Sequence, residues 1–177
     1  MDPLLSRLLD PVYRLCIWAA GGAIVCMSLI IPWGVFARYV LGSGSSWPEP
    51  IAIMLMVMFS FFGAAAAYRA NAHIAVHMLT AALPPPLRRA ASFISDGAML
   101  AVCVFIVIWG TKLCIGTWGQ SIDSLPWMPV GLTYAALPIG SLFTALFVLE
   151  RMAFGSMAQR ALVAFGEPGA NFDEAAP

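Results

Sequence analysis

Four long apolar stretches alternate with short polar segments along this chain. They run at about 15–39, 51–68, 93–116 and 128–149. Each is close to the ~20 residues that a helix needs to cross the ~30 Å hydrocarbon core of a bilayer. The pattern predicts an all-α membrane protein with one four-helix transmembrane domain, 1–152, and a cytoplasmic tail, 153–177, that is partly disordered.

Composition agrees with this class. Hydrophobic residues make up 61% of the chain and charged residues 10%, against roughly 45–50% and 25% in soluble domains. A net charge of zero gives no reason to expect nucleic acid as a partner. The first stretch is longer than the ~7–15 apolar residues of a signal peptide and lacks an A-x-A site, so we expect it to be retained. Transport, membrane-embedded enzymology and a structural role in a membrane complex remain.

The basic residues predict the orientation. With four spans, both termini and the middle loop share one side, which holds Arg7, Arg14, Arg69, Arg88, Arg89, Arg151 and Arg160. The other side has Arg38 and Lys112. This bias places the termini and middle loop in the cytoplasm. We expect Tyr13, Trp18 and Tyr68 to mark the inner interface, and a larger aromatic group to mark the outer one: Trp33, Tyr39, Trp47, Trp118 and Trp127.

The segments between the spans predict three local features. Leu41 to Trp47 is rich in glycine and serine and predicts a short outer turn. The stretch 72–83 predicts an extension of the second helix or a short interfacial helix before three prolines. Pro138 and Gly140 predict a kink in the fourth helix.

Few ionisable residues lie inside the spans. Asp96 and Lys112 lie near opposite ends of the third one, and we expect both to extend toward the headgroups. The alternative is structural pairing, with Lys112 bound to Asp123 or Glu49. This scarcity argues against a proton relay formed by this chain alone.

Arg38 ends the first span and Glu49 begins the second, on either side of the outer turn. Their side chains are expected to approach each other there. An ion pair would hold this hairpin together, and partial burial would strengthen it. The alternative is that either group contacts a partner protein, and the sequence leaves both open.

Two histidines and four cysteines are the remaining candidate ligands. His73 and His77 share a face if their segment is helical. No nearby carboxylate or cysteine completes a metal site, so interfacial or partner-facing histidines are favoured over haem or metal. The cysteines at 16, 26, 103 and 114 form no C-x-x-C and are expected to be apolar core residues. We expect no cofactor.

Gly63 begins a run of small residues, Gly63 to Ala67, on the second span. Small residues allow membrane helices to approach closely. The run predicts either packing within the bundle or docking to another membrane subunit.

Several of these residues occur in an order that resembles a known family. Arg38-Tyr39-Val40, Ser46-Trp47-x-Glu49, Gly63 with its alanines, Arg69 and His73-Ile74-x-Val76 are followed by Leu125-Pro126, Pro129-Val130-Gly131, Tyr134 and Leu137-Pro138-Ile139-Gly140. The sequence from about Arg38 to Glu150 resembles the small permease subunit (DctQ-type) of tripartite ATP-independent periplasmic (TRAP) transporters. Two positions depart from that pattern: Pro50, where an acidic residue is common, and His77, where an Asp is common.

The resemblance implies a function. In such systems a periplasmic binding protein captures an organic acid, and a large membrane subunit imports it with a sodium or proton gradient. The small subunit is thought to support the large one in the bacterial inner membrane, in contact with lipid. Candidate structural or partner-interface residues are then Arg38, Trp47, Glu49, Gly63, Arg69 and His73. The alternative function is a haem- or metal-binding subunit of a redox complex, through His73 or His77.

Overall fold

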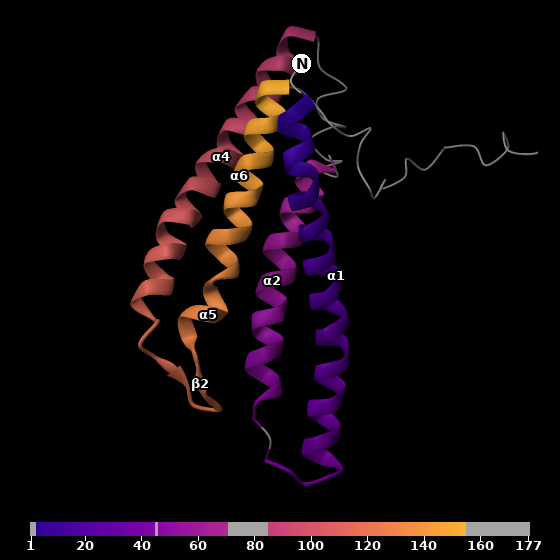
Figure 1. The fold of residues 1–177 in the computed structure, drawn as a ribbon, viewed down its shortest axis with the longest axis vertical. Helices are drawn as coiled ribbons and strands as arrows, with labels where there is room; N and C mark the ends of the chain where they lie inside the picture. The colour runs from indigo at the N-terminus through magenta and orange to yellow at the C-terminus, as the bar shows by residue number, and fades with distance from the viewer. Residues whose placement is uncertain (1–2, 45, 71–84, 155–177) are drawn as a thin grey trace, which may run out of the picture.

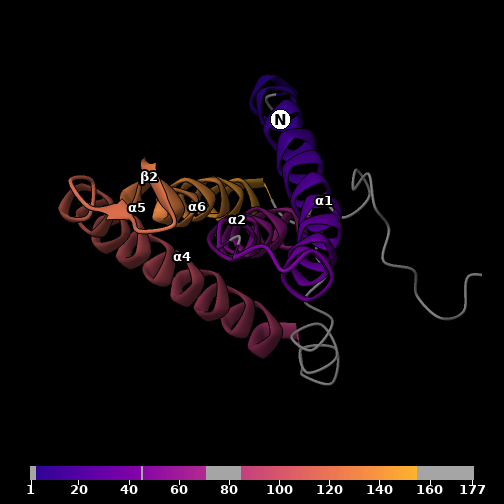
Figure 2. The same ribbon diagram turned by 90° about the horizontal axis from the view of Figure 1, so that it is seen from below.

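The computed structural model describes residues 3–44, 46–70 and 85–154. Helices α1 (Pro3–Tyr39), α2 (Pro48–Arg69) and α4 (Pro85–Gly116) precede a two-stranded hairpin, β1 (Ser121–Ile122) and β2 (Leu125–Pro129). Helices α5 (Val130–Tyr134) and α6 (Ala136–Phe154) follow. The long helices lie side by side along one axis, with α2 between α1 and α6, and α4 on the other side of α6 (Figure 1, Figure 2).

Four segments of this bundle are long and apolar enough to cross a membrane: Leu9–Tyr39, Pro48–Arg69, Ala90–Gly116 and Val130–Ala153. The all-α fold with four spans is therefore confirmed. The first span begins six residues before the predicted Leu15, because α1 is one continuous helix from Pro3. The expected interfacial helix at 72–83 and nearly all of the tail 153–177 lie outside the described residues.

The predicted outer turn joins α1 to α2. Gly42 takes a left-handed conformation, φ +60°, which side chains disfavour, and Ser43 N–H then donates to the Ala37 carbonyl at 3.0 Å. Pro48 is the first residue of α2, where its missing N–H costs no helical hydrogen bond. A Cβ on Gly34 would lie 2.9 Å from Pro48 Cβ, so α1 and α2 touch at this point.

The predicted kink in the fourth span is a break between α5 and α6 at Ala135. Pro138 has no N–H for the Tyr134 carbonyl, and its ring disfavours the helical geometry four residues earlier. At the break, Ala135 N–H donates to the Leu132 carbonyl, three residues earlier, at 3.2 Å. This shorter hydrogen-bonded turn makes the backbone tighter there than in an α-helix. Just beyond, Gly140 lies against α2, where a Cβ would come 2.6 Å from Phe61 Cβ.

The hairpin before α5 was not predicted. Ser121 pairs with Pro129 and Ile122 with Leu125, leaving Asp123 and Ser124 as the two-residue turn. Asp-Ser is not one of the glycine-containing pairs that mark a two-residue hairpin turn, so the sequence offered little indication of this hairpin.

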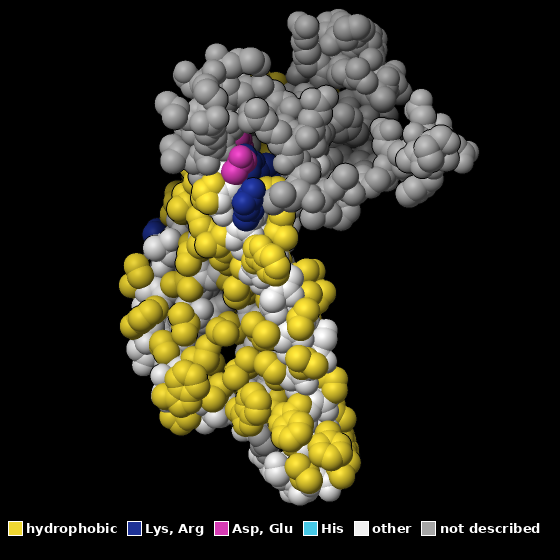
Figure 3. Space-filling model, turned by 45° about the vertical axis from the view of Figure 1, so that its right-hand side comes forward, with side chains coloured by type: hydrophobic (Ala, Val, Ile, Leu, Met, Phe, Trp, Pro, Cys, Tyr) yellow, Lys and Arg dark blue, Asp and Glu magenta, His cyan; other side chains and the backbone are white. Residues whose placement is uncertain are grey.

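The core lies between α1, α2 and α6 toward the end of the bundle that the basic residues assign to the cytoplasm. It consists of Tyr13, Cys16, Ala20, Phe62, Ala65, Tyr68, Phe147 and Val148. Outside this core, the surface of the bundle is largely apolar. Figure 3 shows hydrophobic side chains over most of the described part of one face, with charged side chains gathered near its upper end. A lipid-facing exterior has this composition.

Three residues expected at the inner interface differ in their environment. Tyr13 and Tyr68 are buried, 3% and 4% exposed, whereas Trp18 is 80% exposed. The two tyrosines thus face the inside of the bundle, where each ring packs against an arginine, and their place at the inner interface stays a prediction. Cys16 and Cys103 are buried as expected, but Cys26 is exposed.

Candidate functional site

Arg69, the last residue of α2, lies at the centre of a buried ion cluster. Its Nε donates to Glu150 Oε2 at 3.1 Å and its Nη2 to Glu150 Oε1 at 3.2 Å. Nη2 also donates to Asp10 Oδ1 at 2.8 Å, and Nη1 donates to the Leu9 carbonyl at 3.1 Å. The guanidinium thus joins α2 to α6 and to the first turns of α1.

This cluster is shielded from solvent. The Arg69 and Glu150 side chains are 7% and 2% exposed, and Asp10, at 44%, lies at its edge. The guanidinium carbon lies 5.1 Å from the centre of the Tyr13 ring and 5.2 Å from that of Phe147. A planar guanidinium suits both the two-oxygen pairing with a carboxylate and stacking on aromatic rings, which a lysine would not reproduce.

A second polar cluster lies beside it. Tyr68 Oη donates to Asp96 Oδ1 at 2.8 Å, and Arg151 Nε lies 3.5 Å from Asp96 Oδ2. The Arg151 guanidinium carbon lies 5.5 Å from the centre of the Tyr68 ring. These residues come from α2, α4 and α6, so this cluster connects α4 to the other helices.

Asp96 therefore does not extend to the headgroups as expected. It is 6% exposed, because Tyr68 and Arg151 satisfy its carboxylate inside the bundle. The alternative for Lys112, pairing with Asp123 or Glu49, is not found: its ammonium lies 4.8 Å from the centre of the Trp109 ring, and it forms no ion pair within the described ranges.

The outer hairpin holds three further candidates. Arg38 and Glu49 line the same pocket between α1 and α2, of about 420 Å³. Within residues 3–44, 46–70 and 85–154, no ion pair joins them, and neither has a hydrogen-bond partner. Trp47 is half-buried and precedes the first turn of α2. Of the two roles left open for Arg38 and Glu49, a direct ion pair is thus absent from the structure.

Gly63 faces α1, where a Cβ would lie 3.9 Å from Ala20 Cβ. At this position the small-residue run packs within the bundle. His73 and His77 lie outside the described residues, so the haem or metal alternative stays a prediction. In the described part of the chain, no three His, Cys, Asp or Glu residues are grouped so that they could hold a metal ion.

Sequence reasoning identified Arg69 but missed its partners Asp10 and Glu150. One signal in the sequence could have indicated Glu150: it lies at the inner end of the fourth span, level with Arg69 at the inner end of the second. Both clusters join helices and expose little polar surface. Together with four apolar spans, they define a multi-pass membrane protein whose buried charged groups, within the described residues, hold its own helices together.

Comparison with known proteins gives the family. The sequence model described as "Tripartite ATP-independent periplasmic transporters, DctQ component" matches residues 27–156. A Haemophilus influenzae protein, provisionally named a TRAP transporter small permease protein, is 30% identical over 126 residues, covering 71% of this chain and 78% of that protein. The chain belongs to the DctQ family of TRAP transporter small permease subunits. The predicted resemblance is confirmed, and the family is a transporter component that associates with a large permease subunit.

Proposed function

We propose that this chain acts as a scaffold in a TRAP importer of the bacterial inner membrane. In this proposal the large permease subunit carries an organic acid across the membrane by secondary active transport, using a sodium or proton gradient. A periplasmic binding protein delivers that acid. The small subunit contributes no catalysis, and its helices support the large subunit within the lipid.

The observation that carries the scaffold role is the use of the buried charges. Carriers place substrate and ion sites near the bilayer midplane, among broken helices and available polar groups. In the described bundle, the buried charged side chains are Arg69, Glu150 and Asp96. They lie at the inner ends of their spans and are bonded to other residues of this chain. Such a bundle supplies packing rather than a solute site.

The exterior is also consistent with a partner subunit. Between 11% and 39% of the most apolar window of each span is buried inside the chain. The remaining apolar surface is available to lipid and to helices of a larger membrane protein. Helix α6 is the most buried span, and α1 and α4 lie on the outer sides of the bundle (Figure 2).

Reconstitution into proteoliposomes tests the proposal. This chain, the large subunit, and the two together are each supplied with binding protein, a panel of dicarboxylates, sugar acids and sialic acid, and a sodium or proton gradient. We expect uptake only when both membrane subunits are present. Gradient-driven uptake by this chain alone would contradict the scaffold role. Full uptake by the large subunit alone would contradict the need for a scaffold.

A further inference from the structure

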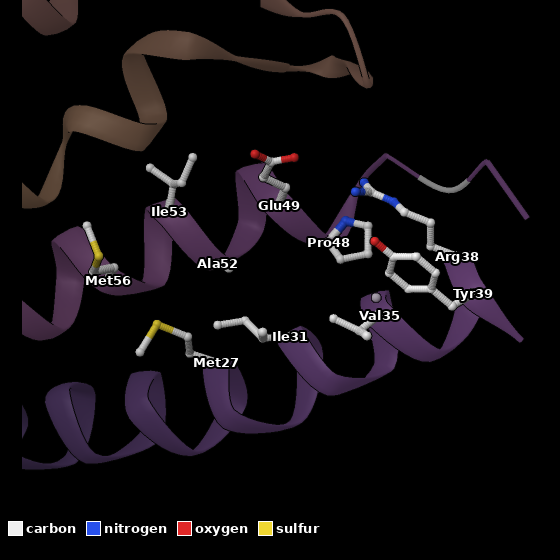
Figure 4. A pocket seen from close by; sticks show the side chains of 11 residues that line it. Met27, Ile31, Val35, Arg38, Tyr39, Pro48, Glu49, Ala52, Ile53 and Met56 are labelled. Carbon is white, nitrogen blue, oxygen red and sulfur yellow. The ribbon is translucent and has the colours of Figure 1, made fainter.

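The pocket between the outer halves of α1 and α2 is an apolar groove with one cation and one anion at its end. Its walls include Met27, Ile31 and Val35 from α1, and Ile53 and Met56 from α2. Figure 4 shows the three α1 side chains directed toward α2, with Arg38 and Glu49 near the end where the two helices are joined.

The contact of Gly34 with Pro48 holds the two helices together within this groove. A Cβ on Gly34 would lie 2.9 Å from Pro48 Cβ and 3.2 Å from its Cγ, so no larger residue fits without separating the helices. Two of the apolar side chains that line the groove are about half exposed: Val35 at 53% and Ile53 at 48%. Because these walls are about half exposed, the groove is open to the outside of the bundle beside this contact.

The two charged groups lie at the depth of the lipid headgroups. Both are at the outer ends of their spans, and Tyr39, also lining the groove, is 79% exposed among the outer aromatic residues. Arg38 and Glu49 have neither hydrogen-bond nor ion-pair partners within the described ranges. A cation and an anion that line one pocket, neither paired within the described part of the chain, match a ligand that carries both charges.

We propose that this groove binds a phospholipid whose headgroup carries a primary ammonium, as phosphoethanolamine does. Its phosphate accepts hydrogen bonds from the Arg38 guanidinium, its ammonium donates to the Glu49 carboxylate, and an acyl chain lies along the apolar walls. The proposal rests on the membrane location of the four spans and not on the scaffold role.

The headgroup chemistry separates this lipid from others. A primary ammonium has three N–H donors for a carboxylate, whereas a choline ammonium has none. An anionic phosphoglycerol headgroup would satisfy Arg38 but leave Glu49 facing negative charge. Glu49 therefore determines the choice of headgroup, and Arg38 determines whether a phospholipid is held at all.

Native mass spectrometry of the full-length protein tests this directly. The protein is released from nanodiscs that contain equal amounts of phosphatidylethanolamine, phosphatidylcholine and phosphatidylglycerol. We expect phosphatidylethanolamine to be retained over phosphatidylcholine by about tenfold, which corresponds to the lower end of the range for one hydrogen bond to a charged group. Glu49→Gln should bring that ratio close to one, and Arg38→Gln should reduce retention of all three lipids.

Two variants on the same side of the membrane serve as matched controls. Asp123→Asn and Lys112→Gln also remove one charge each, outside the groove, and should leave the retention ratio unchanged. Equal retention of the three lipids by the unaltered protein would overturn the proposal, as would an unchanged ratio in Glu49→Gln. Loss of the lipid when the large subunit is co-purified would instead identify the groove as a protein interface. Uptake and assembly assays report separately on the scaffold role.

Discussion

Arg69 and Glu150 meet through two parallel hydrogen bonds, Nε to Oε2 at 3.1 Å and Nη2 to Oε1 at 3.2 Å, although 81 positions separate them. This pairing fixes the inner end of α2 against α6. Because both side chains are almost fully buried, the pair stabilises the fold only when both partners are present. Removing one leaves a buried charge without its partner, which is far costlier than losing an exposed ion pair.

Replacing Arg69 with Gln should therefore destabilise the bundle strongly. We expect a loss of about 3–5 kcal/mol in the free energy of unfolding, since the Glu150 carboxylate would remain buried without a cation. Denaturation in sodium dodecyl sulfate, followed by circular dichroism, measures this. The stability of Arg69→Lys should fall between that of the unaltered protein and that of Arg69→Gln, because an ammonium cannot bind both carboxylate oxygens in the same geometry. Arg14→Gln, at an exposed position of α1, is the control and should change stability by less than about 0.5 kcal/mol. A small effect of Arg69→Gln would show that the cluster adds little.

Tyr68→Phe removes one hydroxyl and leaves the ring in place. Since that hydroxyl donates to the buried Asp96 carboxylate at 2.8 Å, we expect a loss of about 1.5–3 kcal/mol, measured by the same titration. Tyr39→Phe makes the identical chemical change at a side chain that is 79% exposed and should be nearly neutral. Equal effects of the two variants would contradict the role given to the Tyr68 hydroxyl.

The glycines of the helix interfaces give a third prediction, through a matched pair. Gly140→Ala places a Cβ 2.6 Å from Phe61 Cβ, so α2 and α6 must move apart, at a cost of about 1–3 kcal/mol. Gly63→Ala meets its nearest neighbours at 3.9 Å and should be neutral or stabilising, because alanine favours helix. The thermal midpoint of each purified variant in detergent measures the difference. The opposite order would mean that the α1–α2 contact, and not the α2–α6 contact, limits packing.

Arg38 and Glu49 should contribute independently to the stability of the isolated chain. Because no ion pair joins them in the described structure, the effects of Arg38→Ala and Glu49→Ala should add to within about 0.5 kcal/mol. A double-mutant cycle in phospholipid-free detergent measures this, and exchanging the two residues should restore nothing. A coupling well above that value would show that the side chains pair directly in solution.

The elements of this fold were predictable where length and composition decide them. The four spans follow from apolar runs, and the break at Ala135 follows from Pro138, which cannot complete the helix. The rotation of each helix about its axis was not predictable. Apolar residues surround α2 on all sides, so its sequence does not indicate that Tyr68 points to α4 while Arg69 points to α1 and α6. For the same reason Asp96, at the end of an apolar run, was expected at the surface rather than in a polar cluster.

The two clusters also have a mechanical consequence. Both fasten the helices at the same end of the bundle, where the N-terminus of α1 and the end of α6 lie, and the α4–α6 side diverges from α1 and α2 toward the opposite end (Figure 1). A sideways force on the outer hairpins would act far from the residues that hold the helices together, which are Arg69, Glu150 and Asp96. Such a shape resists separation at the end that holds the two clusters and yields first at the end that holds the two hairpins.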